Sequence, residues 1–335
     1  MIGAVVRVML ATTWVLGLPA AVSAQARWLP RVQLDNDAYD FWIMPARRPD
    51  DEYTNGVKLS AESASAPWWG RRFAAGHRGC GEHPAGSEGC LSTTLTLGQD
   101  LYTPRLNRAP YTVPNWRDER PYFAWLYVSG EARLASARTL RSAELALGVT
   151  GPPALGKLAQ QTAHAINRRY TEPATGWETQ IGFEPGVVAT YRESLLALRL
   201  AGNRGLAVDA APSVEASLGN VLTDVSAGGL ARIGWNLSHP WDPAAWSDRA
   251  PVEIWASLGG QASWVARNMS LDGTLSHPDR HVTRVPGVSQ YEIGFGARVR
   301  QLTLAYRAVT RSREYRTGPL HHAFSSMVAG LNFLR

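Results

Sequence analysis

Residues 34–60, LDNDAYDFWIMPARRPDDEYTNGVKLS, place an amide, a carboxylate and a hydroxyl where two strand-like runs meet one loop. Asn36 and Asp37 end the first run, and Thr54 lies at the start of the second. Oxygen ligands of this kind suit Ca²⁺, a hard cation that can stabilise an oxyanion. Asn, Asp and Gly are also ordinary turn residues, and the acidic run that ends at Glu52 can be a solvated loop. This stretch alone therefore also fits a simple hairpin.

Later loops add groups that complete a hydrolytic set. Arg105 and Arg108 follow the third strand-like run, and arginine binds phosphate bidentately. His164 and Glu172 follow the fifth run. A neutral imidazole can take a proton from water, and a carboxylate can orient the imidazole. Together these residue types suit hydrolysis, although His164 taken alone also fits a solvated helix residue.

The first residues have the pattern of a targeting segment. Residues 1–24 hold one early Arg7, an apolar stretch and the small residues VSA before Gln25, as a cleaved secretory signal does. We therefore predict a signal peptide at 1–24 and a single domain at 25–335. A membrane anchor fits less well, because the apolar stretch is short and a small-residue cleavage site follows it. No later run of about 18 apolar residues occurs, so we expect no transmembrane helix.

Strict alternation of apolar and polar residues recurs along the rest of the chain. From Leu206 to Leu218 one face reads LVAPVAL and the other reads ADASES, a period of two that indicates strands. Several runs exceed about nine residues, enough to cross an outer membrane at a tilt, whereas strands of soluble sandwiches are nearer five or six. We predict an all-β fold, a transmembrane antiparallel β-barrel of about 12 strands. The candidate strands are 29–37, 53–63, 91–100, 121–132, 139–149, 186–200, 206–219, 227–238, 251–266, 288–299, 302–313 and 322–334.

Connector lengths indicate which polar groups share one end of this barrel. Short and long connectors largely alternate, as tight periplasmic turns and longer external loops do. The loops after the first, third and fifth strands are then all external, which brings the candidate residues to one rim. In the long connector at 150–185, Leu155, Leu158, Thr162 and Ile166 repeat at helical spacing. We expect a short helix in this external loop, lying over the barrel mouth.

Export also constrains the cysteines and the partners. Only Cys80 and Cys90 occur, and an oxidising compartment favours a disulfide between them over two free thiols. The formal charge of +6 comes mostly from arginine, which suits an anionic lipid partner. Codon bias in a GC-rich genome would explain the arginine content equally well. We expect no nucleic-acid partner and a monomer surrounded by outer-membrane lipid. Trp125 is expected at the external membrane interface, where amphipathic aromatic residues gather.

A string of motifs resembles one family of outer-membrane enzymes. Along the chain the motifs are DNDAYD…DEYTNGVKLS, LGQDLYTP, RPYFAWLY, GVTGPPALGKLAQQTAH and GWETQ, with VTRSREYRTG near the other end. They look like those of the lipid A 3'-O-deacylases, the LpxR family, by motif over residues 32–185 and mainly by pattern beyond. The resemblance implies a twelve-stranded barrel in the bacterial outer membrane and dependence on Ca²⁺. It also implies hydrolysis of the ester that holds the 3'-linked acyloxyacyl chain of lipid A, the membrane anchor of lipopolysaccharide.

The resemblance further implies roles for individual residues. Asn36 and Asp37 fall on the family's pair implicated in binding the metal and the substrate. Thr54 falls on a hydroxyl position that follows a tyrosine. His164 falls on the histidine expected to activate water.

Two positions depart from the family's pattern. Counting back from the GWETQ motif places the family's glutamate at Glu172, whereas counting forward from the histidine reaches Tyr170. The family has a lysine in the loop after LGQDLYTP, and the corresponding loop here contains none. Arg108, and next Arg105, could replace the positive charge of that lysine beside a phosphate or an oxyanion.

Two other functions are compatible with a barrel of this kind. A non-catalytic pore or scaffold would have an open, hydrated lumen. An outer-membrane phospholipase would keep ester hydrolysis and act on phospholipid, but a serine-based enzyme of that type needs a Ser–His pairing for which the sequence shows no convincing spacing.

Overall fold

The computed structural model describes residues 28–37, 52–64, 77, 79–80, 89–105, 118–166, 176–202, 205–241, 251–276 and 280–331. The signal peptide predicted at 1–24 lies outside these residues and stays a prediction. In the described part, no helix has the length and apolar character needed to cross a membrane.

Most of the described chain is antiparallel strand. The strands are β1 (Trp28–Asn36), β2 (Glu52–Ser63), β3 (Cys90–Thr103), β4 (Phe123–Ala135), β5 (Thr139–Thr150), β6 (Pro185–Leu195), β7 (Leu198–Ala201), β8 (Leu206–Gly219), β9 (Leu222–Trp235), β10 (Val252–Asn268), β11 (Gly287–Val299), β12 (Leu302–Ser312) and β13 (His321–Leu331). Between them lie the helices α3 (Gly156–Ile166) and α4 (Met269–Asp272) and the 3₁₀ turns η3 (Pro152–Ala154) and η4 (Trp177–Thr179).

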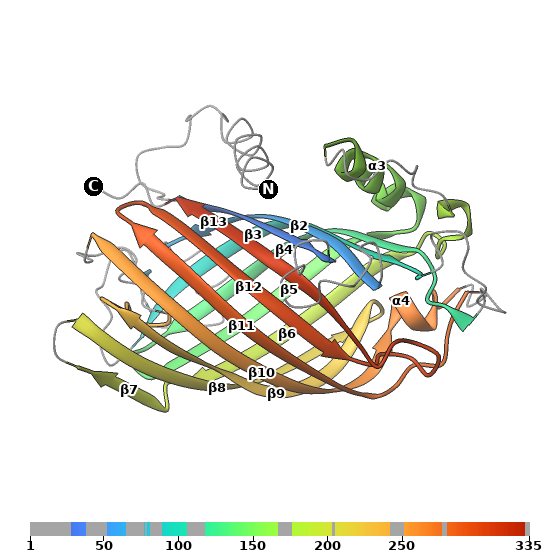
Figure 1. The fold of residues 1–335 in the computed structure, drawn as a ribbon. Coiled ribbons are helices and arrows are strands. Elements are labelled where there is room, and N and C mark those ends of the chain that lie inside the picture. The colour runs from blue at the N-terminus through green and yellow to red at the C-terminus, as the bar shows by residue number, and fades with distance from the viewer. Residues whose placement is uncertain are drawn as a thin grey trace.

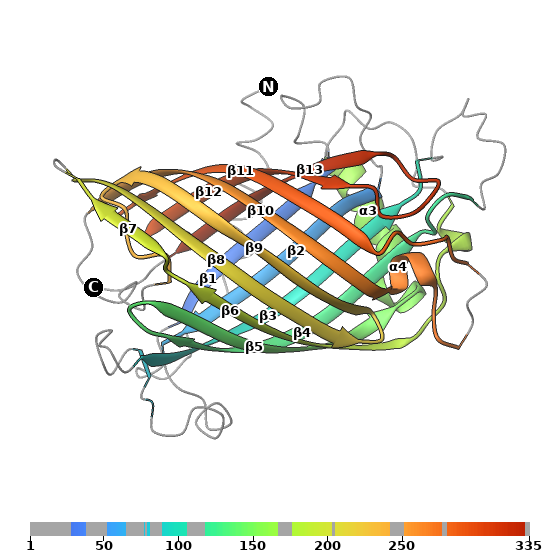
Figure 2. The same cartoon turned by 90° about the horizontal axis from the view of Figure 1, so that it is seen from below.

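The strands close into a tilted barrel (Figures 1 and 2). β1 pairs with β13, and β6 pairs with both β5 and β8. β6 and β7 are successive parts of one strand, interrupted where β6 passes the end of its partner, because Leu195 pairs with Thr139 at the very start of β5. Counting β6 and β7 as one strand gives the closed twelve-stranded antiparallel barrel that the sequence predicts.

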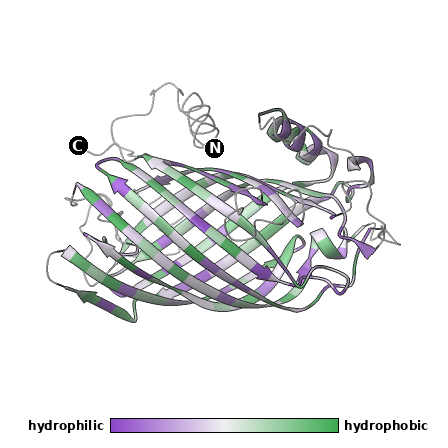
Figure 3. Ribbon diagram, viewed as in Figure 1, coloured by the Kyte–Doolittle hydropathy of each residue, from purple (hydrophilic) through white to green (hydrophobic). Residues whose placement is uncertain are grey.

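The alternation of side chains separates an apolar outer face from a polar lumen. On β3, Leu95 and Leu97 are exposed, and so is Val128 beside them on β4. On the opposite face, Lys58 lies 3.7 Å from Asp100 across β2 and β3. Figure 3 shows the resulting alternation of hydrophobic and hydrophilic positions along each strand. Parity along a strand therefore tells which residues face the lipid.

Aromatic and aliphatic side chains fill the external end of the lumen. The ring of Phe324 packs on Tyr53 at 4.7 Å, Tyr53 on Tyr102 at 5.1 Å, and Tyr102 on Phe123 at 6.0 Å. Trp125 continues this set in a buried cluster that reaches α4. The expectation for Trp125 was wrong, because odd positions of β4 point inward and the indole lies in the lumen rather than at the lipid interface.

The other end of the barrel carries the disulfide. Cys80 and Cys90 are bonded, with their Cα atoms 4.7 Å apart, which confirms the predicted pair. Cys90 is the first residue of β3, and the backbone N–H of Cys80 donates to the carbonyl of Leu91 at 3.0 Å. The bond therefore ties the chain that precedes β3 to the start of that strand.

Candidate functional site

A polar patch interrupts the apolar outer face at the external ends of β1, β2 and β3. Asn36 shares the outward parity of Leu34, and the Asn36 amide nitrogen donates to the Thr54 carbonyl at 3.1 Å and to Asn55 Oδ1 at 3.4 Å. The hydroxyls of Thr54 and Thr103 lie 2.5 Å apart. We call Asn36, Thr54, Asn55 and Thr103 the outer polar patch.

A β-bulge turns Thr54 toward its partner in this patch. The register of β2 against β3 shifts between Tyr53 and Asn55, so Thr54 is the extra residue of the bulge. Thr54 and Thr103 are both almost wholly buried, which makes their mutual hydrogen bond important for satisfying two hydroxyl groups away from water. Bulges of this type often re-aim a side chain at a functional site.

Asp37 follows β1 directly, so it is the next residue in the chain after Asn36 of the outer polar patch. Its side chain is buried, with an exposed fraction of 2%. Because the nitrogen of the Asn36 amide donates to Thr54, the Asn36 oxygen is the amide atom that would coordinate a cation. One carboxylate and one amide oxygen are hard donors, so the residues fit the chemistry of Ca²⁺, which completes its shell with carbonyls, water or substrate.

Helix α3 lies at the same end of the barrel (Figure 1). The predicted helix is confirmed, but it does not cover the barrel mouth. It packs on the outer wall, where Leu101 and Ala124 form a buried cluster with Ala154 and Trp177. Leu101 and Ala124 share the outward parity of the exposed Leu97 and Val128. The outer polar patch and α3 therefore both lie on the outer side of the barrel wall rather than in the lumen.

Two hydrogen bonds link α3 to that wall, one through η3 just before the helix and one through the wall-packed Trp177. Gln99 of β3 donates to the Ala154 carbonyl at 2.6 Å, and the Trp177 indole N–H donates to Gln160 Oε1 at 2.6 Å. His164 follows Gln160 by four residues and so lies on the same face of the helix. The Nε2 atom of His164 is buried although the side chain as a whole is partly exposed. The histidine thus faces the wall that carries the outer polar patch.

The contact between Gly156 and Trp177 gives a test of how α3 packs on the barrel wall. A Cβ atom at position 156 would overlap the Trp177 ring and the Ala124 methyl group. Overpacking of this kind costs roughly 1–3 kcal/mol. Gly156→Ala is therefore expected to speed hydrogen exchange of the α3 amides by about tenfold or more, and that of the barrel strands not at all. Gly182→Ala is the matched control, because no atom lies within 4 Å of a Cβ added there, and it should leave hydrogen exchange of α3 and of the strands unchanged. Equal exchange of the α3 amides in the two variants would contradict the proposed packing of α3 on the wall.

The roles predicted for three arginine and glutamate residues stay predictions. Arg105 donates to both carboxylate oxygens of Glu119 and, at 3.0 Å, to the carbonyl of Thr317. Its guanidinium is thus already engaged by protein, and substrate binding by Arg105 stays a prediction. Arg108 and Glu172 lie outside the described residues, so their roles also stay predictions.

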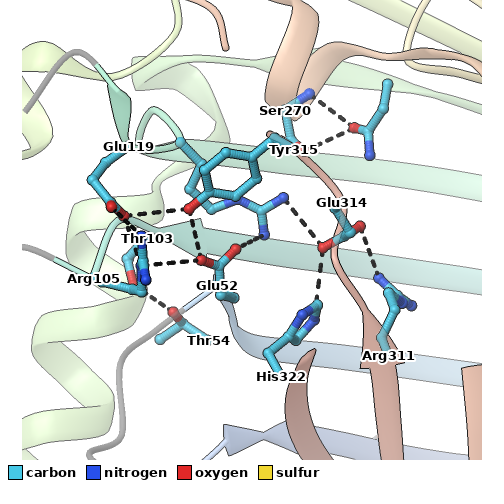
Figure 4. A network of polar contacts seen from close by, with 12 residues as sticks. Glu52, Thr54, Thr103, Arg105, Glu119, Ser270, Arg311, Glu314, Tyr315 and His322 are labelled. Atoms are coloured by element: carbon cyan, nitrogen blue, oxygen red, sulfur yellow. Dashed lines mark hydrogen bonds and ion pairs between the residues drawn. The ribbon is translucent and has the colours of Figure 1, made fainter. Parts of the chain in front are cut away.

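A charged network lies just inside the wall, behind the outer polar patch (Figure 4). Arg120 is completely buried and forms ion pairs with Glu52 at 3.2 Å and with Glu314 at 3.4 Å. The Tyr315 hydroxyl donates to Glu52 at 2.8 Å, and His322 Nε2 lies 3.6 Å from Glu314. Glu52 is two residues before Thr54 and has a positive φ of 68°, so this network holds the start of β2 in a conformation that few residues adopt.

The sequence did not indicate the network. Its members come from separate loops, and the acidic run before Tyr53 suggested a solvated loop, whereas Glu52 is 1% exposed. Burial would raise the pKa of Glu314, but Arg120 and Arg311 outweigh burial and lower this pKa to about 2. The glutamate within VTRSREYRTG was visible in the sequence, but its distant partners were not.

The network also contains three potential metal ligands. Ligand atoms of Glu52, Glu314 and His322 lie within 4.8 Å of one another. The guanidinium of Arg120 already bridges the two carboxylates and supplies their positive charge. Within the described part of the chain, this cluster is therefore an ion-pair network rather than a metal site.

Comparison with known proteins agrees with this geometry. Residues 6–333 match the family described as "Outer membrane protein LpxR". The chain belongs to the LpxR family. Its location is therefore the outer membrane, as the apolar outer face of the barrel requires. No curated protein sequence matches the chain.

Solved structures support the same fold. LpxR from Salmonella typhimurium is similar with a TM-score of 0.70 and 20% identity, over 91% of this chain and 100% of that one. The β domain of the Bordetella autotransporter BrkA has a TM-score of 0.44 at 12% identity, over 92% and 99% of the two chains. The translocator domain of NalP from Neisseria meningitidis has a TM-score of 0.41 at 12% identity, over 99% and 96%. At these identities the LpxR structure supports the twelve-stranded barrel, and the autotransporters add nothing to the argument.

Proposed function

We propose that this LpxR-family protein is a Ca²⁺-dependent esterase that removes the 3'-linked acyloxyacyl chain of lipid A. The observation that carries the proposal is a polar patch, with a histidine-bearing helix beside it, on the outward face of the barrel wall. Lipid A belongs to the outer leaflet and would reach this face by lateral diffusion. A catalytic site in the lumen would instead be separated from its substrate by the wall.

The proposed reaction is hydrolysis by a water molecule. His164 accepts a proton from water as the oxygen attacks the acyl carbonyl, and the protonated imidazole then gives the proton to the departing sugar oxygen. The ester C–O bond breaks, which leaves a free carboxylic acid and a sugar hydroxyl. Thr54, which is hydrogen-bonded to Thr103, would donate a hydrogen bond to the ester.

Asp37 and Asn36 would hold the cation beside this centre. When bound, Ca²⁺ supplies positive charge where the acyl carbonyl oxygen becomes negative. The burial of Asp37 keeps its carboxylate partly shielded from water, which strengthens its attraction for a cation. Glu172 and Arg108 keep the proposed roles of orienting the histidine and binding phosphate.

The direct test is mass spectrometry of the lipid products. Purified protein in vesicles containing lipopolysaccharide is expected to release lipid A that has lost the 3'-linked acyloxyacyl chain, and to stop when Ca²⁺ is chelated. Phospholipid in the same vesicles should stay intact. Release of fatty acid from phospholipid alone would favour a phospholipase, and ion conductance without any hydrolysis would favour a pore.

A substitution at Asp37 tests the cation site. Asp37→Asn removes a charged ligand and keeps its shape, so the Ca²⁺ concentration for half-maximal deacylation should rise by about tenfold or more. Asp118→Asn is the control, because Asp118 is an exposed acidic residue at the same end of the barrel. A calcium titration of both variants checks the prediction, and identical titration curves would exclude Asp37 as a ligand.

A further inference from the structure

Helix α3 has an unusual orientation of its apolar side. Leu155, just before the helix, and Leu158, within it, are 50% and 58% exposed. The face toward the barrel instead carries Gly156 and the buried Gln160. A helix that packs on a protein core turns its apolar residues inward. Here the apolar side chains point away from the protein.

The wall beneath α3 shows what surrounds these side chains. The helix covers outward positions of β3 and β4, and the uncovered outward positions next to them are Leu97 and Val128, at 47% and 58% exposed. These belong to the lipid-facing surface of the barrel. The outer side of α3 continues that surface toward the external end. Phe183, also exposed at 54%, follows η4 in the same loop.

We propose that α3 lies in the outer leaflet, with Leu155, Leu158 and Phe183 inserted among lipid acyl chains. We call these three residues the apolar collar. Lys157 is exposed between the two leucines, and a lysine can place its methylene stem along acyl chains while its ammonium group reaches the phosphate level. An apolar face and a flanking cation are features of an interfacial helix, and the wall on which α3 packs itself faces the bilayer.

The collar has a consequence for access to the outer polar patch. Because α3 is linked to the wall through Gln99 and Trp177, the acyl chains packed around the collar would be separated from His164 only by the width of the helix. A lipid would then enter the site without leaving the leaflet. This step rests on the proposed function, whereas the insertion of the collar does not.

Spin labels test the insertion without any assay of activity. The two native cysteines are bonded to each other, so a single introduced cysteine takes the label. Leu158→Cys is compared with Val128→Cys, an equally exposed position on the barrel wall, and with Glu178→Cys, an exposed polar position in the same loop. The protein is placed in phosphatidylethanolamine and phosphatidylglycerol vesicles, and power saturation is measured with oxygen and with a water-soluble nickel chelate.

The label at position 158 is expected to match position 128, with high access to oxygen and low access to nickel. A response like that at position 178 would overturn the proposal, because the helix would then face water. Immobilisation with spin–spin broadening would overturn it too, because a second copy of the chain would then cover the helix.

A kinetic comparison tests the consequence for access. Leu158→Gln should lower deacylation of lipid A in vesicles by about tenfold, since one leucine side chain leaves the acyl-chain region. It should leave deacylation of detergent-dispersed lipid A unchanged. An equal loss in both assays would refute the access role and indicate a structural one. If the wild-type protein deacylates neither substrate, the proposed function fails, and the spin-label result still decides the insertion.

Discussion

Replacing His164 with alanine is expected to lower lipid A deacylation by about 10²–10⁴-fold, the usual contribution of a general base. The side chain lies on the wall-facing side of α3, four residues after Gln160, and the barrel does not depend on it for closure. The hydrogen exchange of α3 and the unfolding midpoint of the barrel should therefore stay at their wild-type values. Mass spectrometry of lipid A over a time course measures the rate.

The control for His164 comes from the same helix. Gln161 is exposed on α3 and faces away from the wall, so Gln161→Ala should retain wild-type activity. His164→Gln keeps a polar side chain of similar length but cannot take a proton, and it should be as inactive as the alanine variant. Substantial activity in either His164 variant would reject histidine as the base and would leave the fold assignment untouched.

The strands were predictable because two local signals agree. In β8 the alternation from Leu206 to Leu218 and the length of the run both indicate a membrane-crossing strand, and β8 spans Leu206–Gly219. The break between β6 and β7 was not predictable. It depends on where the neighbouring β5 begins, and the sequence of one strand does not indicate the length of the strand that pairs with it.

The place of α3 was mispredicted for a physical reason. The helical spacing of Leu155 and Leu158 correctly predicted a helix, and such a stripe normally packs on protein. In a bilayer the surroundings are themselves apolar, so the stripe can face outward and the small and polar residues can face the wall. The spacing of the leucines therefore predicts that a helix forms, but it does not predict whether its apolar face turns toward the protein or toward the surroundings.

The candidate site was predictable only in part. Asn36 and Thr54 meet because each lies at the external end of its strand, and antiparallel order alone brings those ends together. Thr103 was not singled out, because its contact with Thr54 arises from the β-bulge. The residue types around position 54 do not indicate that a bulge occurs there. Arg120 was missed since its partners Glu52 and Glu314 are far away in the chain.

Arg120→Met is expected to lower the free energy of unfolding of the barrel by about 3–5 kcal/mol, because it leaves buried carboxylates without their shared cation. Methionine fills much of the same volume, so the cost comes from charge rather than from a cavity. The double variant Arg120→Met with Glu52→Gln should recover part of the loss, and the coupling energy of this cycle measures the pair. Arg141→Met removes an exposed arginine paired with Glu193 and should change little.

The pH dependence of stability separates this network from simple packing. In the wild type, Arg120 and Arg311 outweigh burial and hold the pKa of Glu314 at about 2, below its ordinary 4.5. A carboxyl group with a lowered pKa adds stability above pH 4.5 and loses it as the pH falls from 4.5 toward 2. In Arg120→Met the pKa of Glu314 is expected to rise back toward 4.5, because one of the cations that lower it is gone. The variant should therefore lose less stability than the wild type as the pH falls over this interval. Denaturant unfolding in lipid vesicles at several pH values measures both slopes. Parallel slopes, or an unchanged unfolding midpoint at neutral pH, would show that Arg120 does not hold the start of β2 through its charge.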